Sequence, residues 1–322
     1  ILAHFDWNRG IYFSSPAGSD VSKAFYAEGR VQNVGQVYSL LPLKPQASIE
    51  QSKMKMYDHI MNVFDYGNLK APGVLVDYYV RRHTGQFRGD FFDLAIMYAQ
   101  DYRSAMNSAR ANELETMALD TTNTRSALIA TNNKDAEFAA DRVEEVIRKA
   151  MTELPMDRVL DFGEPRPTGR RLSNGRQIFT DGRITELISL LYQVEKIEYA
   201  NELAEEYLAQ LETVLNFMEE SNPYIVYKNE NDFIAFCMNF MRMFREVYTA
   251  NEQEGLSEKV LYMENRLSNI IVPKIESALR NKEITETKNN VSTKRKMNKE
   301  ADDFVALYEA LLEENGLGGM TE

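Results

Sequence analysis

The sequence has few of the residues on which disulfide frameworks and metal sites depend. A single cysteine, Cys237, occurs among the 322 residues, which excludes an internal disulfide and a multi-cysteine metal site. Its neighbours carry a helical apolar pattern, so we interpret it as a core thiol. The three histidines, His4, His59 and His83, are too scattered to suggest a metal triad. We therefore expect neither a metal nor another cofactor.

Long hydrophobic runs are also absent. No stretch approaches the ~18 apolar residues that a membrane-spanning helix needs, and the first residues show no signal-peptide pattern. The chain starts with Ile1-Leu2-Ala3, which is typical of the end of an interrupted apolar segment. We expect a fragment or a processed product, in contact with a membrane only through a missing segment upstream of Ile1.

Basic residues are fewer than acidic residues. Lys and Arg number 37 against 49 Asp and Glu, which gives a net charge of -12. Because phosphates would be repelled at long range, this balance argues against nucleic acid or an anionic membrane surface as a general partner. The length is enough for one large domain or two ordinary ones, each with a sizeable core.

The first part of the chain has strand-like patterns. Residues 11–13 are β-branched or aromatic and lie between turn formers, which predicts a short strand. Residues 24–31 predict a short helix or turn, and residues 36–43 an extended run that prolines confine to a sheet edge or end. We expect a small α/β unit over residues 1–66.

Beyond this unit almost every segment has a helical period. One helix is predicted over 54–64, and Gly67-Asn68 can end it because both residues tolerate the left-handed conformation. The next helix is expected to begin near Gly89-Asp90, and Pro273 should kink or end a later one. Further apolar helical faces occupy residues 91–105, 143–154, 184–191, 204–218, 233–248, 260–270 and 304–312. The predicted fold is mainly α, with antiparallel helical hairpins stacked as a tetratricopeptide-like α-solenoid or a bundle.

Two segments interrupt the helical period. Residues 157–182 are rich in proline and glycine and predict a long irregular connection, whereas residues 282–299 are polar and predict an exposed linker. The predicted organisation is a small α/β unit over 1–66, a helical-repeat domain over 67–281, the linker over 282–299, and a C-terminal helix and tail over 300–322.

Four arginines are the clearest candidate for a binding site. Arg166, Arg170, Arg171 and Arg176 lie close together with little opposing charge, so they could bind a carboxylate, a phosphate or an acidic glycan through bidentate contacts. The alternative is a solvated loop that balances the charge of an acidic protein. No set of residues predicts a catalytic, cofactor-binding or metal site, and we interpret this chain itself as non-catalytic.

Three segments occur in a distinctive order. Residues 8–13 read Asn-Arg-Gly-Ile-Tyr-Phe, residues 35–43 extend towards a proline, and residues 56–68 read Met-Tyr-Asp-His-Ile-Met-Asn-Val-Phe-Asp-Tyr-Gly-Asn. In this order they resemble the large polytopic membrane proteins of Gram-negative bacteria that are related to protein O-mannosyltransferases. Gly10 departs from that pattern, which usually has proline there. The resemblance covers the chain to about residue 100.

That resemblance implies a polytopic glycosyltransferase that uses a lipid-phosphosugar donor, with a soluble C-terminal part on the periplasmic side of the bacterial inner membrane. Its catalytic carboxylate lies between early transmembrane helices, to which no part of this chain corresponds. We therefore expect a non-catalytic domain, tethered by the absent transmembrane region, that supports its own membrane domain or binds the acceptor protein or peptide.

Two other functions stay open. The chain could be a free-standing periplasmic helical-repeat scaffold or glycan-binding module, which an upstream lipoprotein signal and nothing else would favour. It could also be a soluble enzyme, which would need a polar cluster in a pocket.

Overall fold

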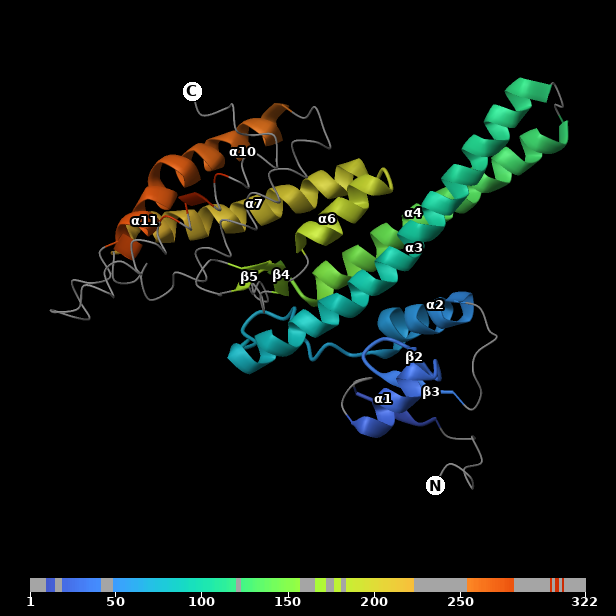
Figure 1. Ribbon diagram of the computed structural model, residues 1–322, viewed down its shortest axis with the longest axis horizontal. Coiled ribbons are helices and arrows are strands. Elements are labelled where there is room, and N and C mark those ends of the chain that lie inside the picture. Colours follow the sequence, from blue (N-terminus) through green and yellow to red (C-terminus); the bar gives the residue numbers. More distant parts are fainter. Residues whose placement is uncertain are drawn as a thin grey trace. The chain divides into compact units, whose positions relative to one another are not determined.

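The computed structural model describes residues 10–14, 19–41, 49–119, 123–156, 166–171, 177–180, 184–222 and 254–280, together with positions 302, 305, 306 and 309. Within these residues the fold is mainly α, with a small three-stranded antiparallel sheet near the N-terminus (Figure 1), which confirms the predicted fold class. None of the helices in the described part is both long enough and apolar enough to span a bilayer.

The chain divides into two compact units, Ile1–Arg158 and Val159–Glu322. The boundaries expected after residues 66, 281 and 299 stay predictions. The helical stripe over 233–248, which includes Cys237, and the linker over 282–299 lie outside the described residues.

The sheet of the first unit is antiparallel, with β3 (Tyr38–Leu40) between β1 (Tyr12–Phe13) and β2 (Val31–Asn33). Ser39 of β3 is the partner of Tyr12 on one side and of Gln32 on the other. The strand predicted over 11–13 is confirmed by β1, and the extended run predicted over 36–43 contains β3, although residues 42 and 43 lie outside the described part. This run was expected at a sheet edge or end, and β3 is instead the central strand.

Helix α1 (Asp20–Ala27) joins the first two strands and begins earlier than the sequence pattern indicated. Ser19 explains this start, because its side chain accepts a hydrogen bond from the Ser22 main-chain N–H, and the Ser22 side chain accepts one from the Ser19 main-chain N–H. Such a capping box satisfies main-chain donors that a helix start leaves without partners. The helix is followed by Gly29, whose φ of 70° suits glycine.

Helix α2 (Ile49–Asp58) continues as a five-residue π-helical segment, η2 (His59–Val63), which holds the turn between β2 and β3. Nδ1 of His59 lies 3.0 Å from the carbonyl oxygen of Val34. The adjacent Gly35 has a φ of 108°, and a Cβ there would lie 2.6 Å from Cε2 of Phe64. Only glycine allows this close approach of the turn to the end of η2.

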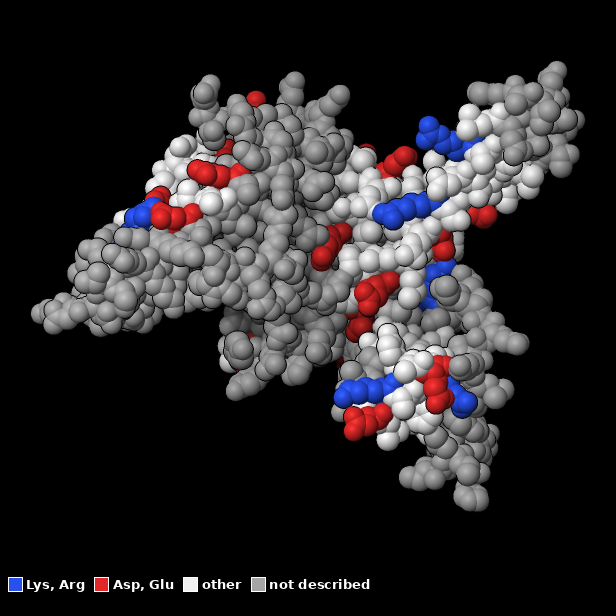
Figure 2. Space-filling view, in the orientation of Figure 1, with Lys and Arg blue, Asp and Glu red and all other residues white. Residues whose placement is uncertain are grey.

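Helices α3 (Tyr78–Leu119) and α4 (Asn123–Glu153) form a long antiparallel hairpin (Figure 1). The expected start near Gly89-Asp90 is wrong, because α3 begins at Tyr78 and runs through both residues. The hairpin buries the predicted apolar faces, which include Phe91, Leu94, Ala95, Val143, Val146, Ile147 and Ala150. On the face of the hairpin that Figure 2 shows, side chains of both charge signs are interspersed.

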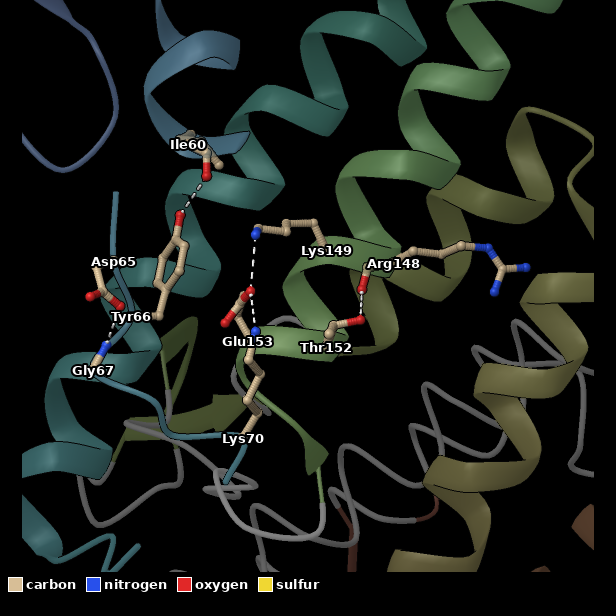
Figure 3. Close-up of polar contacts among 9 residues, drawn as sticks. All are labelled: Ile60, Asp65, Tyr66, Gly67, Lys70, Arg148, Lys149, Thr152 and Glu153. Carbon is tan, nitrogen blue, oxygen red and sulfur yellow. Dashed lines mark hydrogen bonds and ion pairs between the residues drawn. The ribbon is translucent and has the colours of Figure 1, made fainter. Parts of the chain in front are cut away.

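The loop after η2 is anchored to both neighbouring helices (Figure 3). The Tyr66 hydroxyl donates to the carbonyl oxygen of Ile60 at 3.0 Å, while the Lys70 ammonium pairs with Glu153, near the end of α4, at 2.9 Å. Gly67 and Asn68 have φ values of 67° and 58°, which confirms the left-handed turn predicted for them. The loop thereby fixes α2 and η2 beside the hairpin.

The second unit contains a β-hairpin where an irregular connection was expected over 157–182. Strands β4 (Arg166–Arg171) and β5 (Gln177–Thr180) pair antiparallel, so that expectation is wrong for these residues. The predicted helices over 184–191 and 204–218 are confirmed and belong to α6 (Ile184–Gln193) and α7 (Ile197–Glu220).

The later helices of this unit are α10 (Glu254–Arg266) and α11 (Val272–Arg280), joined by the π-helical segment η3 (Leu267–Ile271). Pro273 is the second residue of α11, one residue after the end of η3. Because proline has no main-chain N–H to donate, an irregular turn before it is expected. The described positions within the predicted helix 304–312 are also helical.

Candidate functional site

A pocket of ≈ 600 Å³ lies in the first unit and is lined by residues of α2, η2, α3 and α4. Three helices each contribute one aromatic ring to it: Tyr57 from α2, Tyr98 from α3 and Phe138 from α4. The rings of Tyr57 and Tyr98 are 6.0 Å apart and nearly perpendicular, at 86°. Phe138 is 56% exposed, so its ring is accessible to a ligand.

Lys53 forms the inner cationic part of the pocket. Its residue is only 4% exposed, and its ammonium both pairs with Asp101 and lies 5.0 Å from the centre of the Tyr98 ring. A buried ammonium needs such partners because its desolvation is costly. The carboxylate of Asp101 remains about half exposed, so it is accessible to further hydrogen bonds.

Arg142 forms the second cationic part, on α4. Its guanidinium lies 4.7 Å from the centre of the Tyr57 ring and 5.0 Å from that of Phe138. It also donates to the Tyr57 hydroxyl and pairs with Glu145. These contacts hold a planar five-donor group between two rings.

Tyr57 connects α2 to α4 through its hydroxyl, which donates to Oε1 of Glu145 at 2.9 Å. Burial, followed by this hydrogen bond to Glu145, raises the pKa of Tyr57 to about 12. The phenol is therefore protonated at neutral pH and acts as a neutral donor.

Three carboxylates face the pocket from three helices: Asp58 of α2, Asp101 of α3 and Asp135 of α4. Asp58 also accepts a hydrogen bond from the Asn62 amide at 3.0 Å. No group of three or more His, Cys, Asp or Glu residues within the described ranges is placed to hold a metal ion. The three pocket carboxylates are therefore interpreted as hydrogen-bond acceptors.

Another perturbed carboxyl lies elsewhere on α3. Burial, with the negative charge of Asp93 as a smaller cause, raises the pKa of Asp90 to about 7. The pKa values of Tyr38 and Tyr66 are raised too, mainly by burial and secondly by the charge of Asp90. The charge of this half-buried group therefore acts on Tyr38 of β3 and on Tyr66 of the loop, and we interpret Asp90 as a pH-sensitive structural residue.

The structure places three of the four candidate arginines in one strand. Arg166, Arg170 and Arg171 belong to β4, where Arg166 pairs with Thr180 and Arg171 with Gln177. Arg176 lies outside the described residues. A role for these arginines in anion binding stays a prediction.

Sequence reasoning missed the pocket, although its residues repeat at helical spacing. Lys53 and Tyr57 are four residues apart, Tyr98 and Asp101 three, and Phe138 and Arg142 four. Tyr57 and Tyr98 were assigned to apolar helical faces, which is correct for their rings. The signal that could have found the site is a charged residue paired with an aromatic residue on each of three helices.

Comparisons with protein-family models, curated proteins and solved structures find no significant match to this chain.

Proposed function

We propose that this chain is the non-catalytic C-terminal domain of a membrane glycosyltransferase-like protein, of the protein O-mannosyltransferase-related type. In this proposal it lies on the periplasmic side of the bacterial inner membrane, tethered by its own membrane domain. It binds the acceptor protein or peptide and presents it to that domain.

One observation supports this function most directly. Residues 56–68, the longest segment of the family resemblance, supply Tyr57, Asp58 and Asn62 to the wall of the pocket. The same segment forms the end of α2, all of η2 and the start of the anchored loop. The part of the chain that resembles the family thus also supplies one wall of the pocket beside the helical hairpin.

The pocket has the chemistry of a recognition site. Aromatic rings and arginine are the side chains that contribute most to binding at protein interfaces, and here Arg142 is held between Tyr57 and Phe138. Because these groups are fixed by contacts within the domain, an acceptor would not have to order them.

A transfer assay with the parent protein in membrane vesicles tests this function. Three forms are compared: the complete parent, a parent that ends before Ile1, and a parent with Phe138→Ala. Removal of the chain should reduce sugar transfer to the protein acceptor by about tenfold or more, while turnover of the lipid-phosphosugar donor continues. Phe138→Ala should raise the acceptor concentration needed for half-maximal transfer. Unchanged protein transfer by the shortened parent, or transfer by this chain alone, would contradict the proposal.

A second candidate is a free-standing periplasmic scaffold or glycan-binding module. In favour of it, this chain alone supplies aromatic rings, cations and carboxylates to one pocket. A lipoprotein signal upstream of Ile1, without further apolar spans, would select this alternative.

A further inference from the structure

We infer that the pocket lined by α2, η2, α3 and α4 binds a short neutral oligosaccharide. This inference rests on the proposed function for the place of the binding site and adds the chemical class of the ligand. The acceptor would then be recognised through sugar that it already carries.

The volume and lining of the pocket suit such a ligand. At ≈ 600 Å³ it lies within the range of small-molecule sites, roughly 300–1,000 Å³. Its rings come from three helices, and at its exposed side Phe138 and Met54 are 56% and 63% accessible. The C–H face of a sugar ring is apolar and can lie against such side chains, with its hydroxyls directed to polar groups.

Both cations that line the pocket are already paired. Lys53 pairs with Asp101, and Arg142 pairs with Glu145. An anionic ligand would have to compete with these two carboxylates for their cations, and each exchange would carry a desolvation cost. A ligand without net charge can instead add hydrogen bonds to the pairs and leave them intact.

The Lys53–Asp101 pair, both members of which line the pocket, presents a donor beside an acceptor, which matches the chemistry of hydroxyl groups. A hydroxyl donates one hydrogen bond and accepts others, so neighbouring hydroxyls on a sugar can contact a cation and a carboxylate together. The carboxylates of Asp58 and Asp135 add acceptors from α2 and α4. Because the three carboxylates come from three different helices, they can contact different parts of an extended ligand.

The polar groups are also fixed before a ligand arrives. The buried Lys53 ammonium and the Arg142 guanidinium each lie against an aromatic ring, and Tyr57 bridges α2 and α4 through Glu145. A weakly binding, strongly hydrated ligand such as a sugar benefits from this arrangement, because less side-chain entropy is lost on binding.

Titration of the 322-residue chain with three neutral trisaccharides, maltotriose, mannotriose and chitotriose, tests the inference. Saturation-transfer NMR detects binding and calorimetry gives Kd. At least one trisaccharide should bind, and Phe138→Ala and Asp135→Asn should each weaken it about tenfold. Both side chains are exposed, so neither variant should lose its fold, which circular dichroism checks.

Matched controls are available in the chain. Phe217→Ala removes a ring that is similarly exposed, at 54%, on α7, and Glu137→Gln removes an exposed carboxylate from α4 outside the pocket lining. Both controls should bind the trisaccharide as wild type does. The peptide trilysine and inorganic phosphate serve as charged probes, and neither should displace the sugar.

Three results would overturn the inference: no binding of any trisaccharide, equal binding by wild type and Phe138→Ala, or Phe138-dependent binding of trilysine in place of sugar. The titration uses this chain alone, whereas the transfer assay uses the parent protein. If no trisaccharide binds but transfer still depends on this chain, only the sugar ligand is rejected. If a trisaccharide binds but transfer does not depend on this chain, the acceptor function is rejected.

Discussion

Arg88 donates a hydrogen bond from Nη2 to the carbonyl oxygen of Leu154 at 3.2 Å, and both residues are almost completely buried. Leu154 directly follows α4, so the bond joins α3 to the end of its partner helix. A cation at this position also complements the negative end of the helix dipole. The contact therefore fixes the register of the hairpin on which the pocket is formed.

We expect Arg88→Ala to lower the free energy of unfolding by about 3 kcal/mol, because it removes a buried side chain and leaves a carbonyl without its donor. Arg88→Met keeps most of the volume and should cost less. Urea denaturation followed by circular dichroism measures both. Arg110→Ala, at an exposed position of the same helix, is the control and should change stability by less than about 0.5 kcal/mol. Equal losses for Arg88→Ala and Arg110→Ala would exclude this role.

Asp90 should make stability depend on pH. Its pKa of about 7 lies above the ordinary 3.8, so the folded state binds this proton more tightly than the unfolded state does. The contribution is therefore complete below pH 3.8 and is lost as pH rises to about 7. Asp90→Asn should be more stable than wild type at pH 8, by at most about 4 kcal/mol, and the difference should vanish near pH 4. Denaturation across this pH range provides the measurement, with the exposed Asp135→Asn as control; parallel curves for wild type and Asp90→Asn would be the contrary result.

Glu153 should give stability a pH dependence opposite to that of Asp90. Burial alone would raise its pKa, but the hydrogen bonds from Lys70 and Lys149 outweigh burial and hold the pKa below the ordinary value (Figure 3). Its contribution is present above the ordinary pKa of glutamate and is lost as pH falls through the lower, folded-state pKa. Glu153→Gln should cost about 1–2 kcal/mol at pH 7 and progressively less in acid. A constant difference at every pH would show that the carboxylate charge has no part in the effect.

In the second unit, even a conservative substitution of Arg266 should lower stability. Its Nε donates to Glu219 at 2.9 Å and its Nη2 to Asn216 at 2.6 Å, which ties α10 to α7. The hydrogen bond from Arg266 is also the main reason why the pKa of Glu219 is lowered. Lysine cannot reproduce this fork of donors, so Arg266→Lys should cost about 1 kcal/mol. NMR titration should at the same time show the pKa of Glu219 moving up. Wild-type stability together with an unchanged Glu219 pKa would mean that the fork is not needed.

The pattern of apolar residues predicted helices well where a partner helix covers them. The faces of α3 and α4 were correct from Phe91 onward because the two helices bury each other there. The first turns of α3 were missed because this mutual burial does not extend to them. The helices are antiparallel, and Arg88 contacts Leu154, which directly follows α4. The residues of α3 before Arg88 therefore extend beyond the end of α4, the partner helix that would favour a regular spacing of apolar residues.

Proline and glycine were less reliable as signals of irregular structure. Residues 166–171 contain both and still form β4, since pairing with β5 supplies their hydrogen bonds from a distance in the sequence. The pocket was missed because it depends on the rotation of three helices about their axes. That rotation brings Lys53 to Asp101, 48 residues later in the chain, and no local pattern contains this information.

The sequence encoded directly upstream of Ile1 tests the central claim most directly, because the proposed function requires a membrane domain there. The account predicts a series of apolar stretches, each of ~20 residues, that leads into Ile1-Leu2-Ala3. An upstream region without such stretches, or with a lipoprotein signal alone, would contradict it.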